Sequence, residues 1–132
     1  MKKAYLSIGY QSRRKLSAEI ETIHESLAKK QISLFVFVDS YRFTAAEEKQ
    51  MMQAAFAEIT SSDLLIAEVS EKAIGVGIEI GYAASLQKQI IYLRQAGSEH
   101  STTASGSADH TIVYENRNQL AQKLAEVLSC QE

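Results

Sequence analysis

The chain has 132 residues, a hydrophobic fraction of 45% and a formal net charge of -2. This size suits a single domain with one hydrophobic core, spanning residues 1–132. The lack of a basic surplus argues against a protein that neutralises a nucleic-acid polymer or coats an anionic membrane, so any nucleotide-related substrate is expected to be a small molecule.

Cysteine and histidine are sparse. Cys130 is the single cysteine, so the chain offers neither a disulfide pair nor a cysteine metal cluster. His100 and His110 lack the i, i+4 spacing of a helical metal pair, and we expect no metal and no cofactor. No apolar run approaches the length of a bilayer span, and a strand-like run directly follows Met1-Lys2-Lys3 without a signal-peptide core. We therefore expect a cytoplasmic protein that does not contact membranes.

The first third of the chain alternates strand and helix patterns. The apolar residues 4–8 predict a first strand, and the polar residues 9–14 predict a loop at its carboxyl end. Apolar residues at helical spacing predict an amphipathic helix over residues 13–30. Residues 32–38 are nearly all apolar, which predicts a strand covered on both faces. Residues 39–43 then form a second loop.

A helix is predicted to begin at Thr44, because Thr44 and Glu47 have the spacing of a capping box. Its apolar face runs from Met51 to Ile59. A buried strand follows from about Asp63.

The remaining elements complete an alternating pattern. We expect a helix over residues 76–86, a strand over 89–93 and an irregular loop over 95–110. The sequence ends with a strand over 111–114 and an amphipathic helix through about residue 128.

Five short strands that alternate with helices indicate an α/β protein with a flavodoxin-like three-layer sandwich. Right-handed crossovers favour a five-stranded parallel sheet with the order 2-1-3-4-5. In such sheets ligands bind beyond the carboxyl ends of the strands. The segment 70–79 falls at that edge and is the first candidate site.

Glu79 is the leading candidate within this segment. Gly75 and Gly77 predict a turn whose backbone conformations are closed to other residues and which leaves room for a ligand. Glu79 is placed in the first helical turn, where the helix dipole favours the ionised carboxylate. A carboxylate that faces a cleft can act as a nucleophile. The alternative is that Glu79 only stabilises the helix, by about 0.3–1 kcal/mol, and position alone favours this alternative.

Two further residues remain open on pattern alone. Asp63 stands at the amino end of its strand, so a structural role and a catalytic role are both open. Tyr5 shares one face of the first strand with Ser7, and a tyrosine in such a pattern is more often a core residue. The glycine spacing from Gly75 to Gly81 is only weak evidence for a dinucleotide site, because it has one residue too many and follows the third strand.

The blocks from Ser62 to Ser70 and from Gly75 to Ala83 resemble the nucleoside 2-deoxyribosyltransferase family, most closely its small branch of 2′-deoxynucleoside 5′-phosphate N-hydrolases. By this resemblance Glu79 is the nucleophile that attacks the anomeric carbon of a 2-deoxyribosyl group. Asp63 orients the sugar or handles the proton, and Tyr5 matches a tyrosine close to the nucleophile.

The resemblance also implies substrate-binding residues. Arg94 matches an arginine that ends the fourth strand, and Ser101 matches a serine that contacts the 5′-phosphate across a homodimer interface. Gly9 is the one glycine in a loop that carries several in the N-hydrolases, where this loop cradles the phosphate. Ala73 replaces the aspartate that reads the base in the transferases, so hydrolysis is favoured over base transfer.

The sequence therefore predicts an enzyme that cleaves the N-glycosidic bond of 2′-deoxynucleosides or their 5′-monophosphates through a glutamyl glycosyl-enzyme intermediate, acting as a homodimer. One alternative is a non-catalytic nucleotide-binding or signalling module of the same fold, which the altered loop favours and the joint presence of Tyr5, Asp63 and Glu79 disfavours. Another is an NAD-type glycohydrolase, which would need a pocket for a second nucleotide half.

Overall fold

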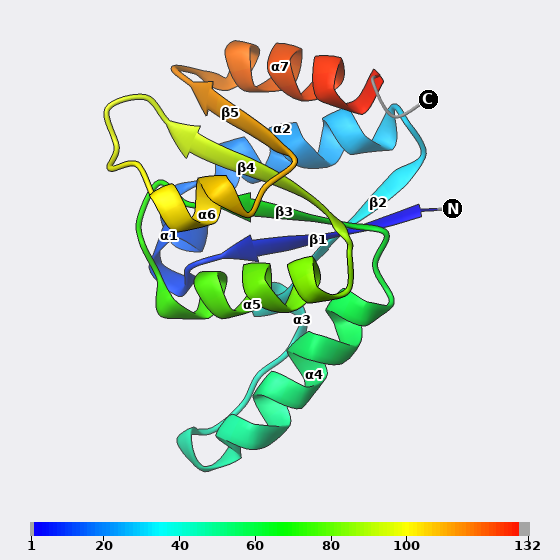
Figure 1. The fold of residues 1–132 in the computed structure, drawn as a ribbon, viewed down its shortest axis with the longest axis vertical. Helices are drawn as coiled ribbons and strands as arrows, with labels where there is room; N and C mark the ends of the chain where they lie inside the picture. The colour runs from blue at the N-terminus through cyan, green and yellow to red at the C-terminus, as the bar shows by residue number, and fades with distance from the viewer. Residues whose placement is uncertain (1, 130–132) are drawn as a thin grey trace.

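The computed structural model describes residues 2–129, which form a parallel sheet with helices on both faces (Figure 1). Every neighbouring pair of strands is parallel. The predicted fold class and strand order are therefore confirmed. In spatial order the strands are β2 (Ile32–Val36), β1 (Lys2–Ile8), β3 (Leu64–Glu68), β4 (Gln89–Gln95) and β5 (His110–Tyr114).

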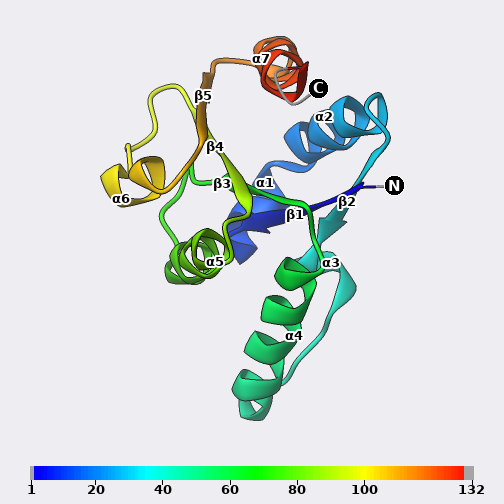
Figure 2. The same ribbon diagram turned by 45° about the vertical axis from the view of Figure 1, so that its right-hand side comes forward.

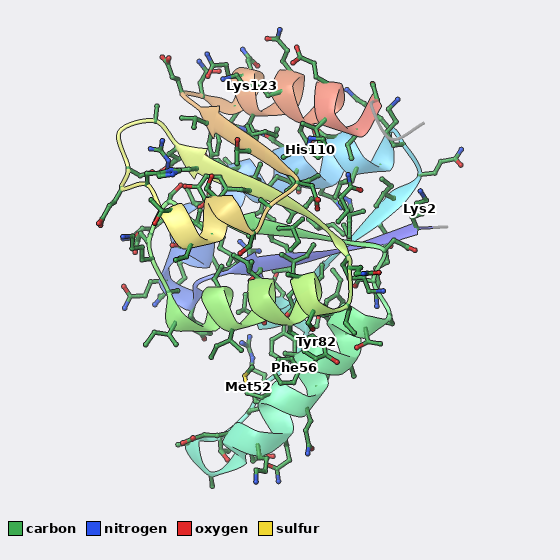
Figure 3. The ribbon with its side chains drawn as sticks, viewed as in Figure 1. Lys2, Met52, Phe56, Tyr82, His110 and Lys123 are labelled. Carbon is green, nitrogen blue, oxygen red and sulfur yellow. The ribbon has the colours of Figure 1, made fainter. Side chains whose placement is uncertain are left out.

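Two helices cover one face of the sheet, and α5 covers the other with the short α6 beside it (Figures 1 and 2). The pair α2 and α7 packs together on the first face. In both views α4 extends away from the sheet. The Phe56 ring of α4 stacks on the Tyr82 ring of α5, with the ring centroids 4.3 Å apart (Figure 3). The helices are α1 (Tyr10–Lys15), α2 (Ser17–Ala28), α3 (Phe37–Ser40), the 3-10 turn η1 (Ala45–Glu47), α4 (Glu48–Thr60), α5 (Ile74–Ser85), α6 (Thr102–Gly106) and α7 (Arg117–Ser129).

The alternation of side chains along β1 divides the core into two parts. Leu6 and Ile8 pack in the cluster under α2 and α7, whereas Tyr5 packs in the cluster under α5. Successive side chains of a strand point to opposite faces. Ser7 therefore lies on the same face as Tyr5, toward α5.

The first loop and the second strand differ from the sequence-based predictions. Residues 10–15 form α1 rather than a loop, and the helix predicted over 13–30 is interrupted at Leu16. The strand predicted over 32–38 ends at Val36, where the chain turns into α3. Coverage on both faces was wrong for this strand, since β2 is an edge strand and Phe35 and Val36 are only half-buried.

The predicted glycine turn before Glu79 is also wrong. The helix α5 begins at Ile74, so Gly75 and Gly77 already lie in its first turn. Within the described residues the only glycine with a positive φ is Gly97. Gly75 and Gly77 are therefore important for the space that they leave rather than for a special backbone conformation.

The loop predicted over residues 95–110 contains the end of β4 and the short helix α6. The capping box at Thr44 is confirmed, because its amide donates to the Glu47 carboxylate at 2.9 Å. The first turn is a 3-10 turn, and α4 begins at Glu48. Cys130 lies outside the described residues.

Candidate active site

The carboxylate of Glu79 is held by two hydroxyl groups of β1. Tyr5 donates its phenolic hydrogen to Oε2 at 2.5 Å, and Ser7 donates to Oε1 at 2.5 Å. Tyr5 and Ser7 are two positions apart on one strand, which places both hydroxyls on the face that α5 covers. Each carboxylate oxygen thus has one fixed donor.

Glu79 lies in the second turn of α5, because the helix begins at Ile74. The effect of the helix dipole falls off within the first turn, so the dipole contributes less to the ionised carboxylate than the sequence suggested. The hydroxyls of Tyr5 and Ser7 take that role instead.

Burial and hydrogen bonding act in opposite directions on Glu79. Burial raises the pKa of the Glu79 carboxyl, while the hydrogen bonds from Ser7 and Tyr5 lower it. Burial, followed by the nearby negative charge of Glu79, raises the pKa of Tyr5 far above its ordinary value. The phenol therefore remains a neutral hydrogen-bond donor while Glu79 accepts.

Three predicted glycines lie around the carboxyl ends of β1 and β3. A Cβ atom at Gly75 or Gly77 would meet no heavy atom within 4 Å, so the first turn of α5 leaves open space. A Cβ atom at Gly9 would lie only 3.3 Å from the Cβ of Ala73. Gly9 therefore allows the start of α1 to approach the start of α5 closely.

An aromatic cluster from β2, α3 and the segment after α3 adjoins the Tyr5 ring. The Tyr5 ring lies 5.9 Å from the ring of Phe35 and 6.3 Å from that of Phe37, measured between centroids. Phe37 stacks on Tyr41 at 4.9 Å, and Tyr41 stacks on Phe43 at 5.7 Å. The sequence did not lead us to place these rings beside the site. The available signal was the four aromatic residues within residues 35–43.

Asp63 is not brought to Glu79. Its Oδ2 accepts the Lys3 amide at 2.8 Å, and its own amide donates to the Lys3 carbonyl at 2.8 Å. Lys3 is at the second position of β1, so this contact lies at the amino edge of the sheet. Asp63 thus joins β1 to the start of β3 at the edge opposite to Glu79. This contact fits the structural role, and the catalytic role stays a prediction.

Arg94 and Ser101 lie on the segments that follow β4. Arg94 donates from Nη1 to the Ser98 carbonyl at 2.7 Å, while its Nε is buried and has no partner within residues 2–129. Ser101 accepts the Ala104 amide at 3.2 Å and caps α6. Ser101 also lines a cavity of about 370 Å³ between α5 and α6, which Glu79 does not line.

A second buried carboxylate lies at the carboxyl end of β3. Glu68 is 1% exposed and accepts hydrogen bonds from the Tyr114 hydroxyl at 2.6 Å, the Ser70 amide at 2.8 Å and the Ser70 hydroxyl at 2.9 Å. The Ser70 hydroxyl in turn accepts the Gln95 amide at 2.8 Å. This network joins the ends of β3, β4 and β5, and it had no signal in the sequence beyond a single charge in an apolar run.

In residues 2–129 no three side chains of His, Cys, Asp or Glu gather as they would around a metal ion. None of the helices there is long and apolar enough to cross a membrane.

The parallel sheet and the carboxylate near its carboxyl edge define an α/β enzyme of the N-glycosidase and deoxyribosyltransferase type. The chain belongs to the nucleoside 2-deoxyribosyltransferase family, whose family model matches residues 4–124. The resemblance found in the sequence is thereby confirmed.

Solved structures share this fold across nearly the whole chain. A CMP N-glycosidase from Clostridium botulinum is 22% identical with a TM-score of 0.69, and the match covers 93% of this chain and 98% of that one. A 2-deoxyribosyltransferase from Leishmania mexicana is 17% identical with a TM-score of 0.65, covering 96% and 98%. A 2-deoxyribosyltransferase from Bacillus psychrosaccharolyticus is 14% identical with a TM-score of 0.69, covering 92% and 95%. No curated protein matches the sequence.

Proposed function

We propose that this protein cleaves the N-glycosidic bond of 2′-deoxynucleosides or their 5′-monophosphates, with Glu79 as the nucleophile. The observation that carries the proposal is the fixed geometry of Glu79, whose two oxygens are each held by one hydroxyl of β1. Family membership supports the same class of reaction.

In the first step one Glu79 oxygen attacks the anomeric carbon, the bond from carbon to the base nitrogen breaks, and its electron pair leaves with the base. A proton from the solvent is added to the departing base, and the second step returns one proton to the solvent. The product is a glycosyl ester on Glu79. In the second step water attacks the anomeric carbon, the ester bond breaks, and the carboxylate is regenerated with release of a proton.

Tyr5 and Ser7 act mainly on the second step. The carboxylate loses its charge when the ester forms and regains it when the ester breaks. Two neutral donors at 2.5 Å stabilise that returning charge, since hydrogen bonds to ionised groups are stronger than neutral ones. The buried setting of Glu79 strengthens this interaction further.

Hydrolysis is proposed rather than base exchange. The family resemblance places a base-reading aspartate six positions before the nucleophile in the transferases, and this chain has Ala73 there. The methyl group of Ala73 faces the position where a Cβ of Gly9 would stand. It offers no hydrogen bond that would hold a second base ready for transfer.

Arg94, Ser101 and the open first turn of α5 at Gly75 and Gly77 are proposed to bind the substrate. The buried Nε of Arg94 has no partner among the described residues, and a ligand oxygen would satisfy it. The resemblance further suggests that Ser101 serves the site of a second subunit. We accordingly propose a homodimer that acts in the cytoplasm on small molecules, without a cofactor.

A non-catalytic nucleotide-binding module remains the second candidate. The observation that favours it is α1, because residues that form a glycine-rich phosphate loop in the N-hydrolases are helical here. Such a module would bind deoxynucleotides without releasing the base.

Base release from a panel of deoxynucleosides and deoxynucleoside monophosphates tests the proposal. We expect free base with the wild type, none with Glu79→Ala, and normal release with Glu126→Ala, whose carboxylate is exposed on α7. A quenched reaction should also give a deoxyribosyl adduct on the peptide that contains Glu79. A folded protein that binds deoxynucleotides and releases no base would contradict the enzyme and select the binding module.

A further inference from the structure

A second cavity, of about 440 Å³, lies where α1 meets α3 and the segment after α3. Its lining is dominated by arginine, in a chain whose formal net charge is -2. The lining residues are Tyr10, Arg13, Arg14, Val38, Asp39 and Arg42. Arg13 and Arg14 are adjacent in α1, and the fold brings Arg42, from the segment after α3, to the same cavity.

One of the three guanidinium groups is neutralised within the cavity. Arg13 donates from Nε to Oδ1 of Asp39 at 2.8 Å and from Nη2 to Oδ2 at 3.0 Å. Its Nη1 donates to the Ser17 hydroxyl at 3.2 Å. Asp39 is thus committed to Arg13 and does not compensate the other two arginines.

Arg14 and Arg42 carry the uncompensated charge. Within residues 2–129 neither side chain has a hydrogen bond, an ion pair or a ring contact. Two guanidinium groups that line one cavity repel each other, and an anion between them removes that repulsion. A ligand with at least one negative charge would therefore be attracted into the cavity.

The cavity differs from the site at Glu79 in its position. Val38 packs against the core cluster under α2, whereas Tyr5, the partner of Glu79, packs in the cluster under α5. Glu79 is not a lining residue. Tyr10 is 65% exposed, so the cavity is open to solvent.

We propose that Arg14 and Arg42 form a phosphate-binding site. Guanidinium groups match phosphate oxygens in planar, two-pronged geometry, and a cavity with two free guanidinium groups suits a phosphoryl dianion. The phosphoryl group comes either from the 5′-phosphate of the nucleotide substrate or from a separate molecule. Only the first source rests on the proposed function.

Calorimetric titration with inorganic phosphate at low ionic strength tests the site without turnover. We expect saturable binding by the wild type and a loss of about tenfold in affinity for each of Arg14→Ala and Arg42→Ala. The matched control is Lys29→Ala with Lys49→Ala, which removes the same charge from exposed positions outside the cavity.

A variant that is expected to bind phosphate more tightly distinguishes loss of the site from loss of folding. Asp39→Asn removes the negative charge that occupies Arg13, so phosphate should bind more tightly than to the wild type. Absence of saturable binding by the wild type overturns the proposal. So does binding that survives the double replacement of Arg14 and Arg42.

Kinetics then distinguish the two sources. If the site holds the 5′-phosphate of the substrate, Arg14→Ala with Arg42→Ala raises KM for deoxynucleoside monophosphates and leaves KM for deoxynucleosides unchanged. If the phosphate belongs to a separate molecule, both KM values stay the same although phosphate binding is lost. Failure of base release with intact phosphate binding would contradict the proposed function alone.

Discussion

Tyr5 and Glu79 are 74 positions apart in the sequence and share a 2.5 Å hydrogen bond between the phenol and the carboxylate. The phenol is buried, and its pKa lies far above the ordinary value because of burial and the charge of Glu79. A phenol with such a raised pKa donates a hydrogen bond and keeps its proton. The contact therefore controls the charge of Glu79, the proposed nucleophile, rather than supplying a general acid.

Tyr5→Phe should shift the pH profile of base release. Burial raises the pKa of Glu79 and the Tyr5 hydrogen bond lowers it, so removal of the hydroxyl leaves the burial effect less opposed. The pKa of Glu79 rises, and the acid limb of kcat/KM moves to higher pH. Above that limb kcat should fall by about tenfold, because the returning carboxylate has lost a charge-assisted hydrogen bond.

Tyr114→Phe is the matched control for this profile. Tyr114 is also buried and also donates to a carboxylate, that of Glu68, at 2.6 Å. Its removal should leave the acid limb in place. An unchanged limb in Tyr5→Phe would contradict the assignment of Glu79 as the titrating nucleophile.

Ser7→Ala should act on the same carboxylate and in the same direction. Ser7 donates to Oε1 while Tyr5 donates to Oε2. Because both donors stabilise one charge, their effects on kcat should not be additive in the double variant. A double-mutant cycle on kcat measures the coupling. Full additivity would indicate that the two hydroxyls act independently of each other.

Glu79→Gln should stabilise the folded protein at neutral pH. Burial raises the folded-state pKa of Glu79 above its value in the unfolded chain. The associated stability is fully present below the unfolded pKa and is lost as the pH rises through the folded pKa. Above that range the buried negative charge of Glu79 lowers the free energy of unfolding, and the neutral glutamine avoids this loss. The Ser7 hydroxyl can accept a hydrogen bond from the glutamine amide.

Thermal unfolding at two pH values measures this effect. The melting temperature of Glu79→Gln should exceed that of the wild type by about 2–4 °C at neutral pH. The difference should shrink as the pH falls below the ordinary range of a glutamate. A lower melting temperature at neutral pH would show that the hydroxyl contacts outweigh the cost of burial.

The fold and Glu79 were accessible from the sequence because they depend on local patterns. Alternation of strands and helices, with right-handed crossovers, favours the order 2-1-3-4-5 that the structure has. Glu79 follows a buried strand at a predictable edge of that sheet. The fold and the position of Glu79 need only the apolar pattern of the chain, whereas the role of Glu79 as a nucleophile is a proposal that came from the family resemblance.

The contact of Ser7 with Glu79 and the contact of Asp63 with Lys3 were not accessible in the same way, and Tyr5 was accessible only through the family resemblance. Whether a strand residue faces a carboxylate depends on how helix α5 sits against β1, and periodicity alone leaves Tyr5 as a core residue. The start of α5 at Ile74 moved Glu79 from the first turn to the second. Because the helix was predicted to begin two residues too late, the helix dipole was expected to stabilise the carboxylate. In the structure two hydroxyl groups stabilise it instead.

The network around Glu68 should contribute to stability and not to the pH profile. Glu68 accepts from Tyr114 and twice from Ser70, and burial raises its pKa against these hydrogen bonds. Glu68→Ala leaves these buried donors without an acceptor and opens a cavity. The free energy of unfolding should fall by about 2–4 kcal/mol.

Urea unfolding of Glu68→Ala and Glu68→Gln separates the two contributions. Glutamine keeps an acceptor for the Ser70 amide, so its loss should be the smaller one. The acid limb of base release should remain that of the wild type in Glu68→Gln. A shifted limb would assign Glu68 a part in the reaction.

Asp63→Ala decides between the two roles that the sequence left open for this residue. Asp63 accepts the Lys3 amide at 2.8 Å at the amino edge of the sheet, whereas Ser7, which holds Glu79, lies near the carboxyl end of the same strand. Alanine removes one charge-assisted hydrogen bond to a backbone amide. We expect a loss of about 1–2 kcal/mol in the free energy of unfolding, with kcat and KM unchanged. The measurement is base release at a temperature where the variant is fully folded. A fall in kcat without a change in stability would return Asp63 to the catalytic site, because a hydrogen bond that only joins β1 to β3 has no means of changing the chemical step.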